Sequence, residues 1–199
     1  MSLFAVCILM LGVIFTWAIL CQHVSRKRWL AVNIVVLCVS TAAILYATIL
    51  TRTPGDYKLI LTPFASLAAA RQQPELYREL LMNVFLFFPL GLTLSNALPQ
   101  KWHCWGRIVL TTFVGCMLSA GIEYAQYRYA LGMAEVDDVI CNTLGAFIGA
   151  ASLLAAHFIE KYQERVRPVR TTGTRILHIV RAAISNGYTW LRKACRRLH

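Results

Sequence analysis

The sequence has few charged residues. Charged side chains make up only 15% of its 199 residues, whereas hydrophobic residues make up 58%. A soluble domain usually contains about 25% charged residues. The low charge therefore excludes an ordinary soluble domain and predicts an integral membrane protein built as one helical bundle.

Metal-binding patterns of cysteine are also missing. The seven cysteines are scattered along the chain, and no two of them have the spacing of a metal site. A free cysteine inside a protein behaves as a small apolar residue. We therefore interpret the cysteines as packing residues.

What the chain does contain is five long apolar segments, each close to the ~20 residues that an α-helix needs to cross a bilayer. The segments are Leu3–Cys21, Leu30–Leu50, Glu79–Ala97, Arg107–Gln126 and Val136–His157. The first has no basic region before it and no small-residue cleavage site after it, so we predict a retained helix rather than a signal peptide. The fold class predicted is an all-α membrane protein, a multi-pass bundle of five transmembrane helices over residues 1–157 in the cell membrane.

The basic residues predict the orientation of this bundle. Fifteen of the 20 lie in three regions: positions 26–28, Lys101 with Arg107, and the tail after His157. Cytoplasmic segments carry an excess of Lys and Arg, so these regions are predicted to be inside and the N-terminus outside. Five spans bring all three regions to one side, which an even number would not. All five histidines fall on this cytoplasmic side, so we do not expect zinc in the outer half.

The tail, residues 158–199, is predicted to be cytoplasmic and basic. From about residue 174, apolar side chains recur at three- and four-residue steps between Arg and Lys, as in Ile176, Ile179, Ile184 and Leu191. This pattern is typical of an amphipathic helix that lies in the headgroup layer of a membrane. Membrane lipids are therefore the expected partners of the tail, and nucleic acid is not.

Polar residues within the last three apolar segments converge on one membrane face. They are Asn83, Glu123, Gln126, Asp137, Asp138 and Asn142. In the predicted orientation all six lie in the outer half of the membrane or at its outer surface, and the inner half is expected to hold few such residues. A carboxylate in the middle of a membrane helix costs roughly 2.5–3.5 kcal/mol. The convergence therefore predicts a polar pocket that opens to the outside.

Helical spacing places these residues on shared faces with small residues. The two faces hold Gly115, Ser119, Glu123 and Gln126 in the fourth segment, and Asp138, Asn142, Gly145 and Gly149 in the fifth. The Gly-x-x-x-Gly pair permits close approach of two membrane helices, so both faces are predicted to point into the bundle. In the third segment, Pro89 and Gly91 predict a kink or break.

The loop 51–78 is long and contains an apolar stretch at residues 59–64 that is too short to span a membrane. It either rests on the bundle, lies along the membrane interface, or dips back between helices.

Three of these segments resemble the VanZ-like family. They are Asn83-Val-Phe-Leu-Phe-Phe-Pro-Leu-Gly91, Glu123-Tyr-Ala-Gln126 and Val136-Asp-Asp-Val-Ile-Cys-Asn-Thr-Leu-Gly145, with weaker similarity at 50–52 and 62–64. The resemblance covers about residues 45–151, and its Asp-Asp-x-x-x-Asn-Thr-x-Gly element is the most specific. It implies a membrane protein of the cell envelope, because the founding member of the family is associated with resistance to the glycopeptide teicoplanin. It brings no established reaction, and the long basic tail departs from the compact family pattern.

The main functional hypothesis is recognition of a lipid-linked or peptidoglycan-related ligand, such as a cell-wall precursor or a glycopeptide, at the outer pocket. The residues proposed to bind it are Arg52, Asn83, Gln126, Arg128, Asp137 and Asn142. Arg52 and Arg128 would hold an anionic group. No cofactor is certain, but the oxygens of Glu123, Asp137 and Asp138 would suit Mg²⁺ or Ca²⁺.

Two other functions stay open from the sequence. One is a membrane enzyme that acts on a lipid or lipid-phosphate, with Glu123 and Asp138 as acid–base residues or with a divalent metal; Ser119 is the one candidate nucleophile considered. The other is a proton-coupled transporter.

A purely structural interpretation also stays open. The amides would then bond across helices, Asp137 or Asp138 would cap the fifth helix, and Glu123 would pair with Arg52 or Arg128.

Overall fold

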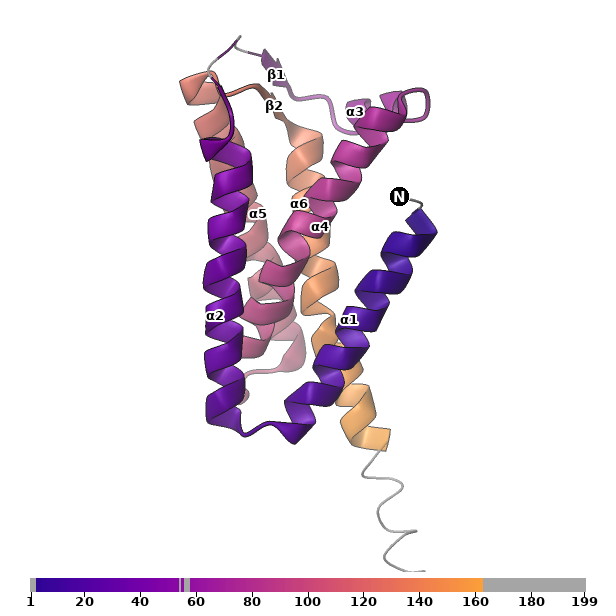
Figure 1. Ribbon diagram of the computed structural model, residues 1–199, viewed down its shortest axis with the longest axis vertical. Coiled ribbons are helices and arrows are strands. Elements are labelled where there is room, and N and C mark those ends of the chain that lie inside the picture. Colours follow the sequence, from indigo (N-terminus) through magenta and orange to yellow (C-terminus); the bar gives the residue numbers. More distant parts are fainter. Residues whose placement is uncertain (1–2, 54, 56–57, 163–199) are drawn as a thin grey trace, which may run out of the picture. The chain divides into compact units, whose positions relative to one another are not determined.

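The computed structural model describes residues 3–53, 55 and 58–162 (Figure 1). The amphipathic helix predicted for the tail lies outside these residues. The described residues up to position 156 form one compact unit.

Five helices are long and apolar enough to cross a membrane, as the sequence predicts. They are α1 (Leu3–His23), α2 (Arg26–Leu45) continued by a π-helical segment η1 (Tyr46–Leu50), α4 (Pro74–Ala97), α5 (Cys104–Tyr129) and α6 (Val136–Ala150). The fifth candidate span extends beyond α6 to Tyr162. Which end of the bundle faces the cytoplasm stays a prediction.

Three short elements lie together at one end of the bundle, called the strand end below. They are β1 (Lys58–Ile60), β2 (Met133–Glu135) and the short helix α3 (Ala65–Ala69). The two strands pair in parallel, with Lys58 opposite Met133 and Ile60 opposite Glu135. The strand end therefore joins the loop before α4 to the residues that lead into α6 (Figure 1). The sequence does not predict this small sheet.

The helix α4 is the centre of the packing, with its most extensive contact to α6 and others to α2 and α5. On one side, Phe88 and Leu92 of α4 form a core with Met10 of α1. On another side, Phe87 of α4 packs with Ile44 of α2 in a second core, which also includes residues of α5 and α6. Apolar burial on several sides thus places α4 inside the bundle.

Glycines allow α4 and α6 to touch along their backbones. A Cβ atom on Gly145 would clash with the carbonyl of Val84, and one on Gly91 would clash with the carbonyl of Ala146. The sequence predicts a kink or break in the third segment. A break is wrong, because α4 runs through Pro89 as one helix, and the kink stays a prediction. Gly91 serves this close approach rather than a break.

Buried polar groups also occur at the end of the bundle opposite the strands. Arg107, only 8% exposed, donates from Nε and Nη2 to the carbonyl of Ser95, at 3.1 and 2.6 Å. Arg26 donates to the carbonyls of Asn96 and Leu98. The two guanidinium groups satisfy carbonyls at the C-terminus of α4, which have no partner within the helix. In the predicted orientation this end of the bundle lies in the inner half of the membrane. The expectation that the inner half holds few buried polar residues is therefore wrong.

Candidate functional site

Asp137 binds the backbone of the loop that precedes α4. Its Oδ1 accepts the amide N–H of Phe64 at 2.5 Å, and its Oδ2 accepts those of Ser66 at 2.8 Å and Leu67 at 3.3 Å. These donors belong to the start of α3 and have no acceptor within that helix. The side chain is 4% exposed. Asp137 therefore caps α3 from a distance, rather than capping its own helix as the structural interpretation expected.

Asp138 faces α4 instead. Its Oδ1 accepts a hydrogen bond of 2.7 Å from the side-chain amide of Asn83. Two adjacent carboxylates of one helix turn thus have different partners: one binds the backbone of α3, and the other binds a side chain of α4.

Glu123 and Glu135 form the next layer of the site. Glu123 Oε2 accepts the backbone N–H of Glu135 at 2.9 Å, so the end of α5 is tied to the residue that precedes α6. The carboxylate of Glu135 accepts a hydrogen bond of 2.5 Å from the hydroxyl of Ser66. Glu135 and Ser66 are not predicted from the sequence, because β2 and α3 are too short to show a periodic pattern.

Asn142 and Ser119 close the site toward the middle of the bundle. The amide Nδ2 of Asn142 donates to the hydroxyl of Ser119 at 2.8 Å. Ser119 lies one turn before Glu123, and Asn142 lies one turn after Asp138, so this contact sits directly below the carboxylates. The buried oxygen Oδ1 of Asn142 has no hydrogen-bond partner among the described residues.

Gln126 points from α5 toward η1. Its Nε2 donates to the carbonyl of Thr48 at 2.9 Å, which satisfies one of the free carbonyls at the end of that segment. Its Oε1 is buried, and no residue in the described part of the chain is its hydrogen-bond partner. Gln126 therefore joins two helices, as the structural interpretation expected of the amides.

The two candidate arginines differ in position. Arg52 lies near the site, since its positive charge acts on the carboxyl groups of both Glu123 and Asp138. Its Nη1 would be 3.1 Å from a Cβ atom on Gly132, a glycine with φ +122°. Arg128 is exposed in the last turn of α5. It follows Glu123 by five positions, which turns it about 140° round the helix axis and away from the carboxylate.

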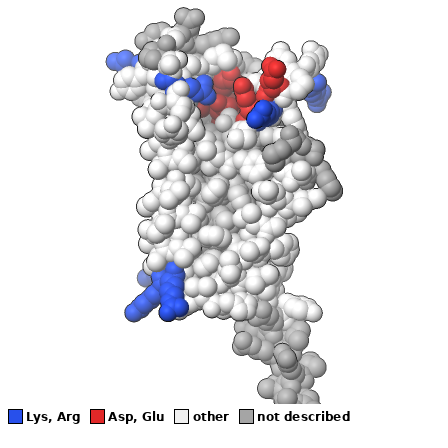
Figure 2. Space-filling view, viewed as in Figure 1, with Lys and Arg blue, Asp and Glu red and all other residues white. Residues whose placement is uncertain are grey.

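We call Asn83, Ser119, Glu123, Glu135, Asp138 and Asn142 the polar cluster. Figure 2 shows acidic side chains gathered at the strand end with basic side chains beside them, and a separate basic group at the opposite end. The charges of Asp138 and Glu135 act on the carboxyl group of Glu123. The charge of Glu79 acts on Asp138. Like charges repel one another, so the ionised cluster is a source of negative potential.

The cluster does not form a recognised metal centre. Among the described residues, no group of three or more His, Cys, Asp or Glu side chains is placed to hold a metal ion. Both oxygens of Asp137 already accept backbone amides. A Mg²⁺ or Ca²⁺ site on Glu123, Asp137 and Asp138 stays a prediction.

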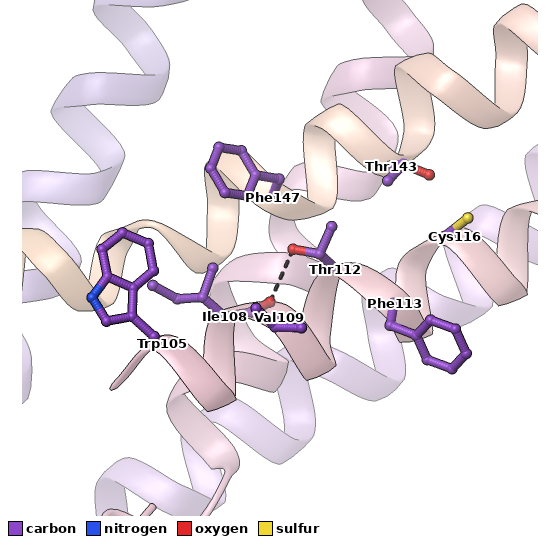
Figure 3. A pocket seen from close by; sticks show the side chains of 8 residues that line it. All are labelled: Trp105, Ile108, Val109, Thr112, Phe113, Cys116, Thr143 and Phe147. Atoms are coloured by element: carbon purple, nitrogen blue, oxygen red, sulfur yellow. Dashed lines mark hydrogen bonds between the residues drawn. The ribbon is translucent and has the colours of Figure 1, made fainter. Parts of the chain in front are cut away.

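A groove of about 320 Å³ lies apart from the cluster, between α5 and α6 (Figure 3). It is lined by Trp105, Ile108, Val109, Thr112, Phe113, Cys116, Thr143 and Phe147. The hydroxyl of Thr112 bonds to the carbonyl of Ile108 in its own helix at 2.9 Å. The groove thus presents an almost wholly apolar surface along two candidate membrane spans.

These features define a helical membrane protein with several candidate spans and with buried carboxylates at one end. A model of the VanZ/LLP1 family matches residues 3–159 of the chain. The chain therefore belongs to the VanZ/LLP1 family, which confirms the resemblance seen in its motifs.

Protein VanZ of Enterococcus faecium is 33% identical to the chain over 110 residues. The matched part is 54% of this chain and 61% of that protein, so the chain spans less than two thirds of this relative. No solved structure matches the chain significantly.

Proposed function

We propose that the chain is a cell-envelope protein that recognises a lipid-linked or peptidoglycan-related ligand at the polar cluster and supports resistance to glycopeptides such as teicoplanin. Membership of the VanZ/LLP1 family supports the envelope role. The gathering of Glu123, Glu135 and Asp138 at one end of a membrane bundle supports the site.

One observation carries the proposal: these three carboxylates come together, and no cation among the described residues is in direct contact with them. Their hydrogen-bond donors are the backbone of Glu135, the hydroxyl of Ser66 and the amide of Asn83, all of them neutral. Burying charged groups costs free energy that neutral partners only partly return. Helix packing alone would be better served by apolar side chains, so a role beyond packing is the better explanation.

A second candidate function, a membrane enzyme, is favoured by the contact between Ser66 and Glu135. A hydroxyl that donates to a carboxylate at 2.5 Å has the arrangement of a nucleophile beside its base. Ser66 replaces Ser119 as the serine that fits this chemistry, because Ser119 accepts a bond from Asn142 rather than lying against a carboxylate.

The test neutralises the carboxylates without changing their shape. Glu123→Gln and Asp138→Asn remove charge and keep most hydrogen bonds, so we expect stability in detergent to hold and teicoplanin resistance in cells to fall to that of cells without the chain. Glu75→Gln is the matched control, because Glu75 is exposed in the first turn of α4. Full resistance in both cluster variants would reject the proposed site.

A further inference from the structure

We propose that the polar cluster binds an organic ammonium group, whose N–H donors are shared among Glu123, Asp138 and the amide oxygen of Asn142. This inference rests on the proposed function, since it names the ligand class of the same site. The sequence analysis favoured an anionic ligand held by Arg52 and Arg128, and the geometry argues for the opposite charge.

The charge of the cluster is the first argument. Glu123, Glu135 and Asp138 are mutual electrostatic neighbours, and Glu79 lies near Asp138. Against these four acidic groups, Arg52 is the basic group that influences Glu123 and Asp138, and its side chain is exposed. An anionic ligand would be repelled here, whereas a cation would relieve the repulsion among the carboxylates.

The unused hydrogen-bonding capacity is the second and independent argument. Asn142 is 3% exposed, and its Nδ2 is fixed by Ser119 while its Oδ1 has no partner. Asn142 lies one turn below Asp138 on α6, and its partner Ser119 lies one turn below Glu123 on α5. The side chain of Asn142 is therefore at the floor of the cluster. In the described part of the chain, each of Glu123 and Asp138 accepts a bond through one oxygen only. When both carboxylates are ionised, all the free positions are acceptors, and a ligand that donates hydrogen bonds would satisfy them.

The geometry distinguishes an ammonium group from a metal ion. A bare Mg²⁺ or Ca²⁺ needs several oxygens within about 2.0–2.6 Å of one point, and among the described residues no group of three or more His, Cys, Asp or Glu side chains is placed to supply them. An ammonium group reaches its acceptors through hydrogen bonds of about 2.7–2.9 Å and has three donors to distribute. A primary amine therefore satisfies both the charge and the free acceptors.

Two sources carry this chemistry, an aminolipid headgroup and a soluble amine. The experiment uses the purified full chain in detergent, with binding measured by native mass spectrometry and thermal shift. The probes are phosphatidylethanolamine, phosphatidylcholine and phosphatidylglycerol with identical acyl chains, and free ethanolamine. We expect phosphatidylethanolamine to bind at least about tenfold more tightly than the other two lipids, since only its headgroup combines positive charge with N–H donors.

Variants connect this preference to the cluster. Glu123→Gln and Asp138→Asn are expected to weaken phosphatidylethanolamine binding by about 10- to 100-fold each, as expected for a charge-assisted hydrogen bond. Glu75→Gln, outside the cluster, is expected to leave it unchanged. Asn142→Asp places a carboxylate of the same shape beside the free acceptors and is expected to tighten phosphatidylethanolamine binding. This variant tests the inference by a gain of affinity rather than by a loss. Unfolding temperatures without lipid show whether each variant is folded.

The outcomes separate the sources and the hypotheses. Competition by ethanolamine supports a soluble amine, and binding of phosphatidylethanolamine alone supports a lipid. Equal binding of phosphatidylglycerol, or unchanged affinity in folded Glu123→Gln and Asp138→Asn, overturns the inference. Loss of teicoplanin resistance in these variants without any amine binding would reject the ammonium ligand and leave the proposed function standing. Amine binding by the unaltered chain, together with full resistance in both variants, would reject the proposed function and leave the ammonium ligand standing.

Discussion

The carboxylate of Asp137 accepts the backbone amide of Ser66 at 2.8 Å, although the two residues are 71 positions apart in the sequence. Phe64, just before α3, has a positive φ of 63° and donates its own amide to the other oxygen of Asp137. The strand end thus depends on one buried side chain to hold an unusual backbone conformation. Asp137 therefore makes structural contacts directly beside the polar cluster.

We expect Asp137→Ala to lower the free energy of unfolding by about 1–3 kcal/mol, because three backbone amides lose their acceptor. Asp138→Asn in the same turn is the control, since an asparagine there can still accept from Asn83 and is expected to change stability little. Thermal unfolding in detergent measures both. Equal losses in the two variants would contradict the division of roles between the two aspartates.

Ser66→Ala tests whether the serine is an anchor or a nucleophile. As an anchor, its loss removes the bond to Glu135, and we expect about 1–3 kcal/mol less stability with resistance still present. Ser66→Thr keeps the hydroxyl group and is expected to be as stable as the unaltered chain. A Ser66→Ala protein that unfolds at the normal temperature but confers no resistance would instead favour the enzyme.

Gly145→Ala and Gly121→Ala form a matched pair of helix substitutions. A Cβ atom on Gly145 would meet the backbone of Val84, whereas one on Gly121 would have no atom within 4 Å. We expect Gly145→Ala to destabilise the bundle by about 1–3 kcal/mol or more through overpacking. Gly121→Ala is expected to be neutral or to stabilise by about 0.5–1 kcal/mol, because alanine favours the helix. Unfolding temperatures that move together would show that α4 and α6 do not need this close contact.

The orientation of the bundle is tested by cysteine labelling in intact cells, with all native cysteines replaced. Thr53→Cys at the strand end and Gln100→Cys at the opposite end are both exposed positions. From the distribution of Lys and Arg, we expect a membrane-impermeant maleimide to modify the first and not the second. The reverse pattern would turn the polar cluster toward the cytoplasm and remove its access to an extracellular ligand.

Regular spacing explains which parts of the structure the sequence predicts. Length and hydropathy identify the five spans, and the i, i+4 faces bring Glu123 above Ser119 and Asp138 above Asn142, so both pairs were found. Glu135 was missed because it lies in a three-residue strand, whose pairing partner is about 75 positions away.

Arg107 shows the same limit at the other end of the bundle. A basic residue at the start of an apolar segment predicts a solvated flank, but this one is buried against a carbonyl of α4. Only the three-dimensional packing of α4 against α5 places an unpaired carbonyl within its reach.

The pairing of β1 with β2 has a consequence for biosynthesis. Each described hydrogen bond between residues 58–69 and a remote part of the chain comes from residues 133–137: the strand ladder, Glu135 and Asp137. Because a chain is made from its N-terminus, residues 58–69 leave the ribosome long before any of these contacts exist. They can take up their final position only once the start of α6 has been synthesised. A nascent chain arrested within α5 would therefore carry Glu123 into the membrane with neither its backbone donor nor its neighbouring carboxylates, and the polar cluster would be among the last parts of the bundle to assemble.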